Sequence, residues 1–334
     1  MIMMRRNLMK INKNIENKYV YYSSALPKGI KGLMLKLYAK GMSWIYKPVL
    51  NIIRPHQNST EEKKYDVVVG AIFKNEAKYL KEWIEFNRIV GVQHFYMYNN
   101  FSDDNYMEVL EPYIQEGIVD LIDWPVKQGQ ISAYKDCYDK HRKDAKWIGF
   151  IDIDEYIVPN KMDSIYDFLK LFEKNRAAVI VNWRIFGTSG HIEKNMNETM
   201  VERYTVCWDK YCSIGKCFYN TKYDIDKDYK NNTGFHHTGW GKIKNMNLPP
   251  VNVFDKVSIF QMNYIKTNEL PIQINHYFTK SFDEYVEKRA KGDVYYEVNP
   301  HDEEYFYAHE MRCRTVDYSA YKYLIKLKRK MRNI

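Results

Sequence analysis

Short apolar runs alternate with amphipathic stretches between residues 67 and 151, and this alternation constrains the fold more than any other feature of the chain. The apolar runs predict buried strands at 67–73, 94–98, 119–124 and 147–151. Apolar residues at helical spacing predict helices between these strands, at 76–90, 104–115 and 132–142. Strands that alternate with helices predict an α/β fold, in which a mainly parallel sheet carries helices on both faces.

The pattern continues less regularly beyond the fourth strand. A helix is predicted at 163–175 and a strand at 178–183, whereas residues 187–250 are predicted to be rich in loops. A capping box at Ser281–Glu284 predicts a further helix that ends near Gly292.

Two carboxylates, Asp152 and Asp154, directly follow the apolar run 147–151. Ligands of an open parallel α/β sheet bind at the carboxyl ends of its strands. Two acidic side chains at that edge are costly to bury unless a cation balances their charge. Mg²⁺ and Mn²⁺ take oxygen ligands and often bridge to substrate phosphates. The pair therefore predicts a site for a metal ion and a diphosphate, and the alternative is an ordinary solvated loop.

Polar residues also follow the first two predicted strands. Asn75 and Glu76 come after 67–73, and Asn99 and Asp104 come at and after the end of 94–98. Short polar side chains at strand ends suit hydrogen bonds to a nucleotide. The alternative is that they form turns and helix caps without a ligand.

The order of these motifs resembles glycosyltransferase family 92 and its bacterial family-2-like relatives. The resemblance extends over about residues 66–190, is thinner to about 292, and rests on Phe73–Glu76, Tyr79–Glu85, Gly91–Asn99 and Trp147–Tyr156. It implies a GT-A fold over residues 65–300 and a glycosyltransferase of the hexosyltransferase type, which inverts by direct displacement. It also implies a divalent metal, Mn²⁺ or Mg²⁺, and a nucleotide-sugar donor of the UDP type.

The resemblance further implies roles for single residues. The metal ligands would be Asp152, Asp154 and His276, with Asp154 the more direct ligand; the alternative for His276 is a buried, hydrogen-bonded side chain. Catalysis would involve Asp154 and Glu155, although Glu155 faces away if the segment is extended. The donor would contact Phe73, Asn75, Glu76, Asn99, Asp104 and Asp152.

The acceptor site is predicted from residues that follow the strand at 178–183. Trp183 and Arg184 would contact the acceptor, together with His237. Arg184 could instead pair with a diphosphate, and Trp183 and His237 could be packed side chains. An inverting transfer needs a general base, for which Glu202 and Asp209 are open candidates.

Both ends of the chain are apolar and basic, and the whole chain has a net charge of +9. Residues 1–64 are predicted to be an N-terminal helical extension and 301–334 a basic C-terminal helical tail. The segments 27–55 and 321–332 suit helices that lie on an anionic membrane, and the alternative is helices packed on the core with lysines in water. No run reaches the ~18 apolar residues of a membrane span, and we expect no secretory signal. We expect a cytoplasmic protein, peripheral on the inner face of the membrane.

These observations together predict metal-dependent sugar transfer to a glycan or glycolipid acceptor, in bacterial surface polysaccharide or lipopolysaccharide synthesis. One alternative is a metal-dependent phosphoryl-transfer enzyme or nuclease, which also uses paired carboxylates. Another is a non-enzymatic basic module that binds membranes or polysaccharides. Nucleic acid is not expected as a partner, because no RNP, zinc-finger or helix-turn-helix pattern is present.

Overall fold

A computed structural model describes residues 18–22, 27, 29–55, 62–225, 235, 239–259, 265–291 and 301–332. Its central sheet consists of β2 (Tyr65–Phe73), β3 (His94–Asn99), β4 (Val119–Asp123), β5 (Ala145–Phe150), β6 (Glu155–Pro159), β7 (Ala178–Ile185), β10 (Gly215–Asn220), β14 (Val251–Asn252) and β15 (Ile272–His276). These strands lie in the order β4–β3–β2–β5–β10–β7–β15–β6, and β14 pairs with β7.

The four strands predicted between residues 67 and 151 are present as β2, β3, β4 and β5, and they pair in parallel. Beyond β5, strand β10 runs antiparallel to both of its neighbours, and β15 is parallel to β7 but antiparallel to β6. The predicted α/β fold with a mainly parallel sheet is confirmed. Residues 187–250 were predicted to be rich in loops, and this is wrong at β10, which is a central strand of the sheet. The strand was not predicted because the buried Lys216 interrupts the apolar run that a central strand normally has.

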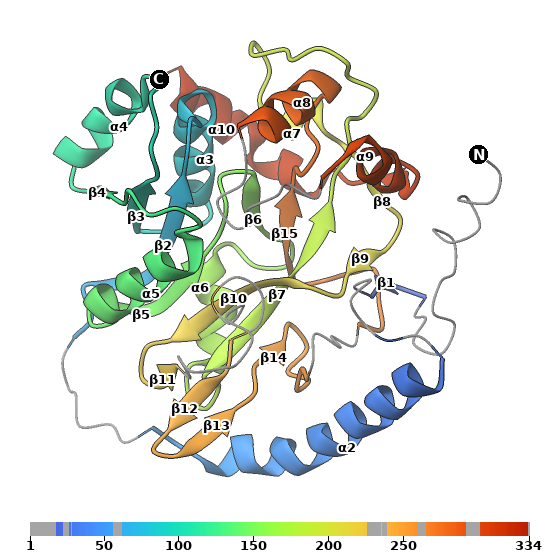
Figure 1. Cartoon of the computed structure of the whole chain (residues 1–334). Helices are drawn as coiled ribbons and strands as arrows, with labels where there is room; N and C mark the ends of the chain where they lie inside the picture. The colour runs from blue at the N-terminus through green and yellow to red at the C-terminus, as the bar shows by residue number, and fades with distance from the viewer. Residues whose placement is uncertain are drawn as a thin grey trace.

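Helices cover both faces of this sheet, as predicted (Figure 1). One face carries α3 (Ala77–Ile89), α4 (Tyr106–Gln115) and α6 (Ile165–Leu169), and the other carries α5 (Gln130–His141). Side chains alternate along β2, so that Val69 packs on the side of α3 whereas Val68 packs on the side of α5. The helix predicted at 163–175 is shorter, because α6 passes into the 3₁₀ turn η1 (Lys170–Phe172).

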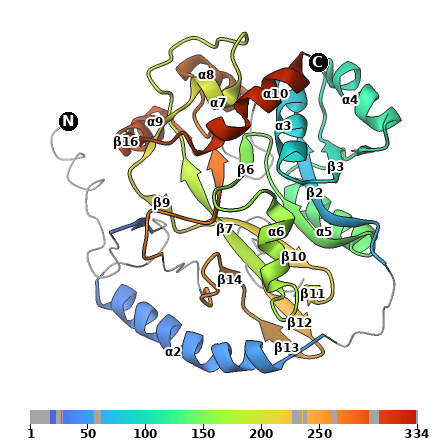
Figure 2. The ribbon, with the colours of Figure 1, turned by 180° about the vertical axis from the view of Figure 1, so that it is seen from behind.

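The C-terminal part of the chain adds helices above the end of the sheet at which β15 finishes (Figures 1 and 2). These are α7 (Met200–Arg203), α8 (Phe282–Ala290), α9 (Glu303–Glu310), α10 (Leu324–Met331) and the 3₁₀ helix η2 (Ser319–Tyr323). The predicted capping box is present, since the Ser281 hydroxyl accepts a hydrogen bond from the backbone N–H of Glu284 at 3.2 Å.

Short strands form three smaller sheets. β1 (Val20–Tyr21) pairs with β9 (Tyr211–Cys212), and β8 (Val206–Trp208) pairs with β16 (Cys313–Val316). The third consists of β11 (Asp224–Ile225), β12 (Gly241–Ile243) and β13 (Met246–Leu248). The segment 301–334 is therefore not wholly helical as predicted, since β16 lies within it.

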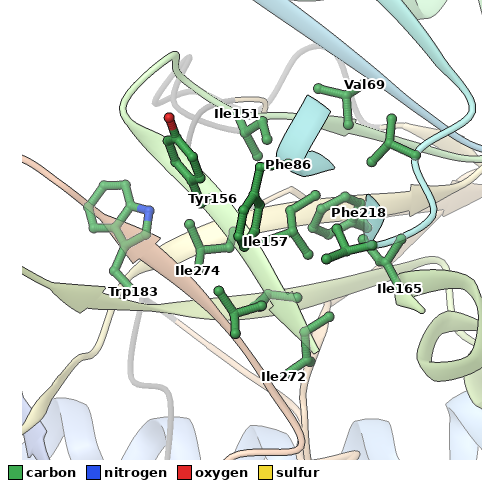
Figure 3. Packing of buried hydrophobic residues seen from close by; sticks show 14 of the residues in the cluster. Val69, Phe86, Ile151, Tyr156, Ile157, Ile165, Trp183, Phe218, Ile272 and Ile274 are labelled. Atoms are coloured by element: carbon green, nitrogen blue, oxygen red, sulfur yellow. The ribbon is translucent and has the colours of Figure 1, made fainter. Parts of the chain in front are cut away.

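The larger hydrophobic core lies between the sheet and the helices α3 and α6. Figure 3 shows side chains from distant parts of the sequence meeting there, including Phe86 of α3, Ile157 of β6, Ile165 of α6 and Ile274 of β15. These side chains are fully buried. Their packing fixes the carboxyl ends of β5 and β15 relative to one another, and the candidate site lies at these ends.

Helix α2 (Ile30–Ile52) lies across the end of the molecule opposite to α8 and α10 in both views (Figures 1 and 2). The two segments whose composition suits a membrane surface therefore lie at opposite ends of the molecule. Helix α10 packs against α3, where the Lys81 ammonium group donates to the carbonyl of Met331 at 3.0 Å. Within the described ranges, none of the helices has both the length and the apolarity needed to cross a bilayer.

Candidate active site

Asp152 and Asp154 lie in the tight turn that joins β5 to β6, at the carboxyl end of the parallel strands. The turn is fixed from beneath. The indole N–H of Trp83 is 2.9 Å from the carbonyl oxygens of both Asp152 and Glu155, and the backbone N–H of Glu155 donates to Asp152 O at 3.0 Å. The sequence placed both aspartates at this edge correctly.

Asp152 is held by three side chains from different elements. Its Oδ1 accepts hydrogen bonds from Gln130 Nε2 at 3.0 Å and from the Tyr134 hydroxyl at 2.9 Å, both on α5. Its Oδ2 lies 2.8 Å from Lys216 Nζ, which comes from β10 and is fully buried. Both carboxylate oxygens of Asp152 are therefore bound within the protein.

Asp154 is more closely associated with α8 and β15. Its Oδ2 accepts a 2.6 Å hydrogen bond from Lys288 Nζ, and its Oδ1 lies 3.6 Å from His276 Nε2. Burial opposes ionisation of Asp154, yet the charges of Lys288, His276 and Lys280 outweigh it and lower the pKa of this carboxyl to about 2. Asp154 is thus a carboxylate at neutral pH, and it is compensated mainly by one lysine.

His276 is a neutral imidazole at neutral pH. Burial lowers its pKa to about 4, against the opposing effect of Asp154. The ring packs against Trp183 with a centroid distance of 4.7 Å. A neutral imidazole can bind a metal ion, whereas an imidazolium cannot. The chemistry of this side chain therefore fits the ligand role expected of it.

Glu155 does not lie at the surface of the site. Its side chain is fully buried, and its Oε2 accepts a 2.9 Å hydrogen bond from the backbone N–H of Asp152. Burial and the charges of Asp152 and Asp154 raise the pKa of Glu155 well above its usual range, against the effect of Lys216. This environment favours a role in holding the turn over direct contact with a substrate.

Lysines next to and within α8 bind the polar end of β2. Lys280 Nζ lies 3.7 Å from Glu76 Oε2, and Lys291 Nζ lies 3.3 Å from Glu76 Oε1. Lys291 also donates to the carbonyl of Asn75 at 2.6 Å. Burial lowers the pKa of Lys280, whose ammonium group lies 3.6 Å from the centroid of the Tyr79 ring. Asn75 and Glu76 therefore belong to the same edge as Asp154.

The end of β3 forms a network of its own. Asn99 Nδ2 donates to Asp123 Oδ1 at 3.0 Å and to the hydroxyl of Tyr106 at 3.0 Å. Phe73 is a buried core residue that packs on Tyr106. The structure thus gives both Asn99 and Phe73 contacts within the protein, and their donor contacts stay a prediction.

One carboxylate oxygen of Asp104 accepts a hydrogen bond within the protein, and the other has no partner among the described residues. Its Oδ2 accepts from the backbone N–H of Ala77, at the start of α3, at 2.8 Å. Its Oδ1 is buried and has no hydrogen-bond partner among the described residues. A buried acceptor of this kind is costly unless a ligand or water reaches it. The geometry is consistent with the nucleotide contact that was predicted for Asp104.

The predicted acceptor residues separate in the structure. Trp183 packs on His276 and so lies beside the site, whereas its neighbour Arg184 lies on the opposite face of β7. Arg184 Nε lies 3.3 Å from Asp317 Oδ2, and its guanidinium group lies over the Tyr211 ring. The structure therefore does not bring Arg184 to Asp154. His237 lies outside the described residues.

The two open candidates for the general base also have other contacts. Glu202 forms a capping box with Thr199 at the start of α7 and binds Lys328. Asp209 accepts a 2.6 Å hydrogen bond from the Tyr21 hydroxyl. Both carboxylates are thus engaged away from the aspartates of the turn, so the structure supports neither as the base.

Sequence reasoning missed the lysines of the site, Lys216, Lys280, Lys288 and Lys291. Lys288 and Lys291 are three residues apart on the predicted helix behind the capping box, which puts them on one helix face. That spacing was a readable signal. Lys216 had none, because the strand that carries it was not predicted.

The donor atoms at the turn fit a divalent cation only in part. In the part of the chain that the structure describes, no group of three or more His, Cys, Asp or Glu side chains is placed to hold a metal. Asp154 Oδ1 and His276 Nε2 are 3.6 Å apart, too far for a hydrogen bond between them, and provide one oxygen and one neutral nitrogen. Mg²⁺ and Mn²⁺ sites often have only one or two protein ligands, since substrate phosphates supply others. Two of the three expected ligands therefore fit, whereas the oxygens of Asp152 are already bound.

Comparison with known sequences matches the model of "Glycosyltransferase family 92" to residues 63–293. A family 92 protein of Ricinus communis is 31% identical over 104 residues, which are 31% of this chain and 18% of that protein. A beta-1,4-galactosyltransferase of Caenorhabditis elegans is 27% identical over 165 residues, 43% of this chain and 39% of that enzyme. The matched region thus spans well under half of these relatives.

Two solved structures are weakly similar to the chain. Staphylococcus aureus TarS in complex with UDP has a TM-score of 0.29 at 12% identity, and covers 47% of each chain. A mannosyltransferase from Pyrobaculum calidifontis, in complex with GDP-mannose and Mn²⁺, has a TM-score of 0.29 at 15% identity over 45% of each chain. The curled, mainly parallel sheet and the match at residues 63–293 agree with the GT-A fold that the sequence resemblance implied.

Proposed function

The chain belongs to glycosyltransferase family 92, and from this membership we propose that it transfers a sugar from a nucleotide-sugar donor to a glycan hydroxyl group. The observation that carries the proposal is the pairing of Asp154 with Lys288 and with neutral His276 at the carboxyl edge of the parallel sheet. Open α/β sheets bind their ligands at this edge. We propose a UDP-linked hexose as the donor, in accord with the family resemblance.

The lysines in and next to α8 support a diphosphate as the leaving group. Lys288 is bound to Asp154, and Lys280 and Lys291 are bound to Glu76, so several ammonium groups gather at one edge. A departing nucleoside diphosphate accumulates negative charge on its oxygens. Fixed cations that stabilise this charge in the transition state speed the transfer. The lysines would act in this way, and they also hold Asp154 and Glu76 before the donor binds.

We propose that Asp154 and His276 hold a divalent metal when the donor is bound. Such an ion would supply Lewis-acid stabilisation of the diphosphate oxygens. Asp152 would act indirectly, because Gln130, Tyr134 and Lys216 fill its hydrogen-bonding positions and fix the turn. Glu155 would also act by fixing the turn, since it is buried beneath it.

We propose Asp104 as the side chain that binds the nucleoside, because its buried Oδ1 lacks a hydrogen-bond partner within the described residues. Trp183 would border the sugar, as it packs on His276. Inversion by direct displacement remains an expectation from the family resemblance. The two relatives reported above come from a plant and a nematode, so they give no support to the bacterial surface glycan that we expected as acceptor.

The proposal is tested with a panel of nucleotide sugars, by measuring sugar release with Mn²⁺. One UDP-sugar should be cleaved, and Asp154→Asn should reduce the rate at least tenfold without loss of folding. Asp139→Asn is the matched control, because this exposed aspartate of α5 lies outside the site. A phosphoryl-transfer enzyme or nuclease would break phosphate bonds and release no free sugar, and a non-enzymatic binding module would cleave nothing. Equal activity of the two variants would contradict the role of Asp154.

A further inference from the structure

Helix α2 presents an apolar face to the outside of the molecule. Six large hydrophobic side chains on this face are each at least 60% exposed and recur at helical spacing, at Ile30, Met34, Leu37, Trp44, Ile45 and Ile52. Single exposed apolar residues are ordinary, but a continuous stripe along a long helix marks an interaction surface.

The opposite face of α2 is fixed to the body of the protein. Gly32, Ala39 and Leu50 are its buried residues, and the Ser43 hydroxyl lies 3.3 Å from the carbonyl of Val257. Near the end of the helix, Arg176 Nη1 donates to the carbonyl of Leu50 at 3.1 Å. These contacts hold the helix in place, and so the exposed stripe is not merely the unpacked side of a loose segment.

The charges of α2 identify the partner. Lys36, Lys40 and Lys47 follow one border of the apolar face and Lys31 follows the other, and the helix contains no aspartate or glutamate. A helix with an apolar stripe between basic borders lies in the interface of an anionic bilayer. A second copy of the chain would place lysines against lysines, which is unfavourable. We propose that α2 docks this protein on an anionic lipid surface.

The C-terminal helix does not share this role. α10 lies at the other end of the molecule from α2 in both views, so one flat surface cannot contact both (Figures 1 and 2). One of its basic side chains also has a partner in the protein, as Lys328 binds Glu202. Of the two interpretations that the sequence left open, we therefore propose membrane contact for α2 and packing on the core for α10.

The position of α2 gives the membrane-bound protein an orientation. α8, which supplies the Lys288 partner of Asp154, lies at the end of the molecule opposite to α2 (Figure 1). The edge that holds Asp154 would therefore face away from the lipid. Given the function proposed above, the acceptor would be a glycan end that stands away from the bilayer rather than a sugar at the lipid headgroup.

Cosedimentation of the full chain with vesicles tests the proposal. We expect binding to phosphatidylcholine vesicles that contain phosphatidylglycerol, and weak binding to pure phosphatidylcholine. The double variant Trp44→Ser/Ile45→Ser should lose at least tenfold in affinity, and Lys36→Gln/Lys40→Gln/Lys47→Gln should lose the preference for anionic vesicles. Ile192→Ser is the control, since Ile192 is 68% exposed outside α2. Its binding should equal that of the original chain.

Three results would overturn the proposal. These are no binding to anionic vesicles, equal binding by the Trp44→Ser/Ile45→Ser variant, and a dimer in solution that this variant dissociates. The melting temperature and its shift with UDP are measured for every variant, so that a folding defect is recognised. Because vesicle binding requires no sugar transfer, failure of this proposal and failure of the proposed function are distinguishable.

Discussion

Lys216 Nζ lies 2.8 Å from Asp152 Oδ2, and the lysine side chain is fully buried whereas 25% of the aspartate side chain remains exposed. Lys216 is also 3.6 Å from Glu155 Oε2. One internal cation thus lies next to two carboxyl groups of the β5–β6 turn and compensates the charge of Asp152. A buried ion pair of this kind contributes little net stability, but removal of one partner leaves an uncompensated charge.

We predict that Lys216→Met lowers the free energy of unfolding by about 3 kcal/mol, because Asp152 then lacks its cation. Urea denaturation at neutral pH measures this loss. Lys222→Met is the control, since Lys222 and Glu173 form a partly exposed ion pair. That variant should cost less than about 1 kcal/mol. Equal losses in the two variants would show that Lys216 is not the counter-ion of the turn.

Lys288 should contribute directly to the affinity for nucleoside diphosphates. We predict that Lys288→Gln weakens binding of UDP about tenfold, or ~1.4 kcal/mol, because a cation next to Asp154 is lost. Isothermal titration calorimetry measures the affinity. Arg289→Gln removes the same charge from an exposed position on the same helix and should bind UDP normally. A weakening of the same size in Arg289→Gln would point to a general charge effect.

The parallel half of the fold was predictable from sequence for a local reason. β2 and β5 are apolar runs that end at polar residues, and the intervening helices have apolar residues at helical spacing. The end of β5 therefore located Asp152 and Asp154. β10 was missed because Gly215 and Lys216 break its apolar run. Gly215 is nevertheless required in the strand, because a Cβ at this position would lie 1.9 Å from the carbonyl oxygen of Val181.

The assembly of the site depends on contacts between distant segments, which a single sequence does not reveal. Lys288 follows Asp154 by more than a hundred residues and reaches it through α8, whereas the similarly distant His276 was placed beside Asp154 only through the family resemblance. Arg184 was predicted beside Trp183 because they are neighbours in sequence, yet neighbours on a strand face opposite sides. The orientation of β7 decides which of the two faces the site.

The free energy of unfolding should depend on pH through protonation of Glu82, a buried side chain whose Oε1 accepts a 2.8 Å hydrogen bond from the backbone N–H of Met200. Burial raises the pKa of Glu82 from an ordinary value of 4.5 to about 7. The folded protein therefore binds more protons than the unfolded chain between pH 4.5 and 7, and the free energy of unfolding falls as pH rises through this window. The contribution of protonated Glu82 to the free energy of unfolding is fully present below pH 4.5.

We predict that Glu82→Gln removes this part of the pH dependence, which is on the order of 3 kcal/mol for a shift of this size. Urea denaturation from pH 4.5 to 8 measures the profile, and circular dichroism checks the fold at each pH. The variant should gain stability relative to the original chain as pH rises. A profile that keeps the original slope would mean that Glu82 does not bind its proton in the folded state.

The two aspartates of the turn should respond differently to substitution. Asp154 has one oxygen 3.6 Å from His276, whereas both oxygens of Asp152 are bound to Gln130, Tyr134 and Lys216. We predict that Mn²⁺ with UDP raises the melting temperature more than UDP alone. EDTA should abolish this metal-dependent part of the shift, and so should Asp154→Asn. Asp152→Asn should retain a smaller metal-dependent shift, because Asp154 and His276 remain. Complete loss in both variants would mean that Asp152 also binds the ion, so that its contacts to α5 and β10 must rearrange when metal and donor enter.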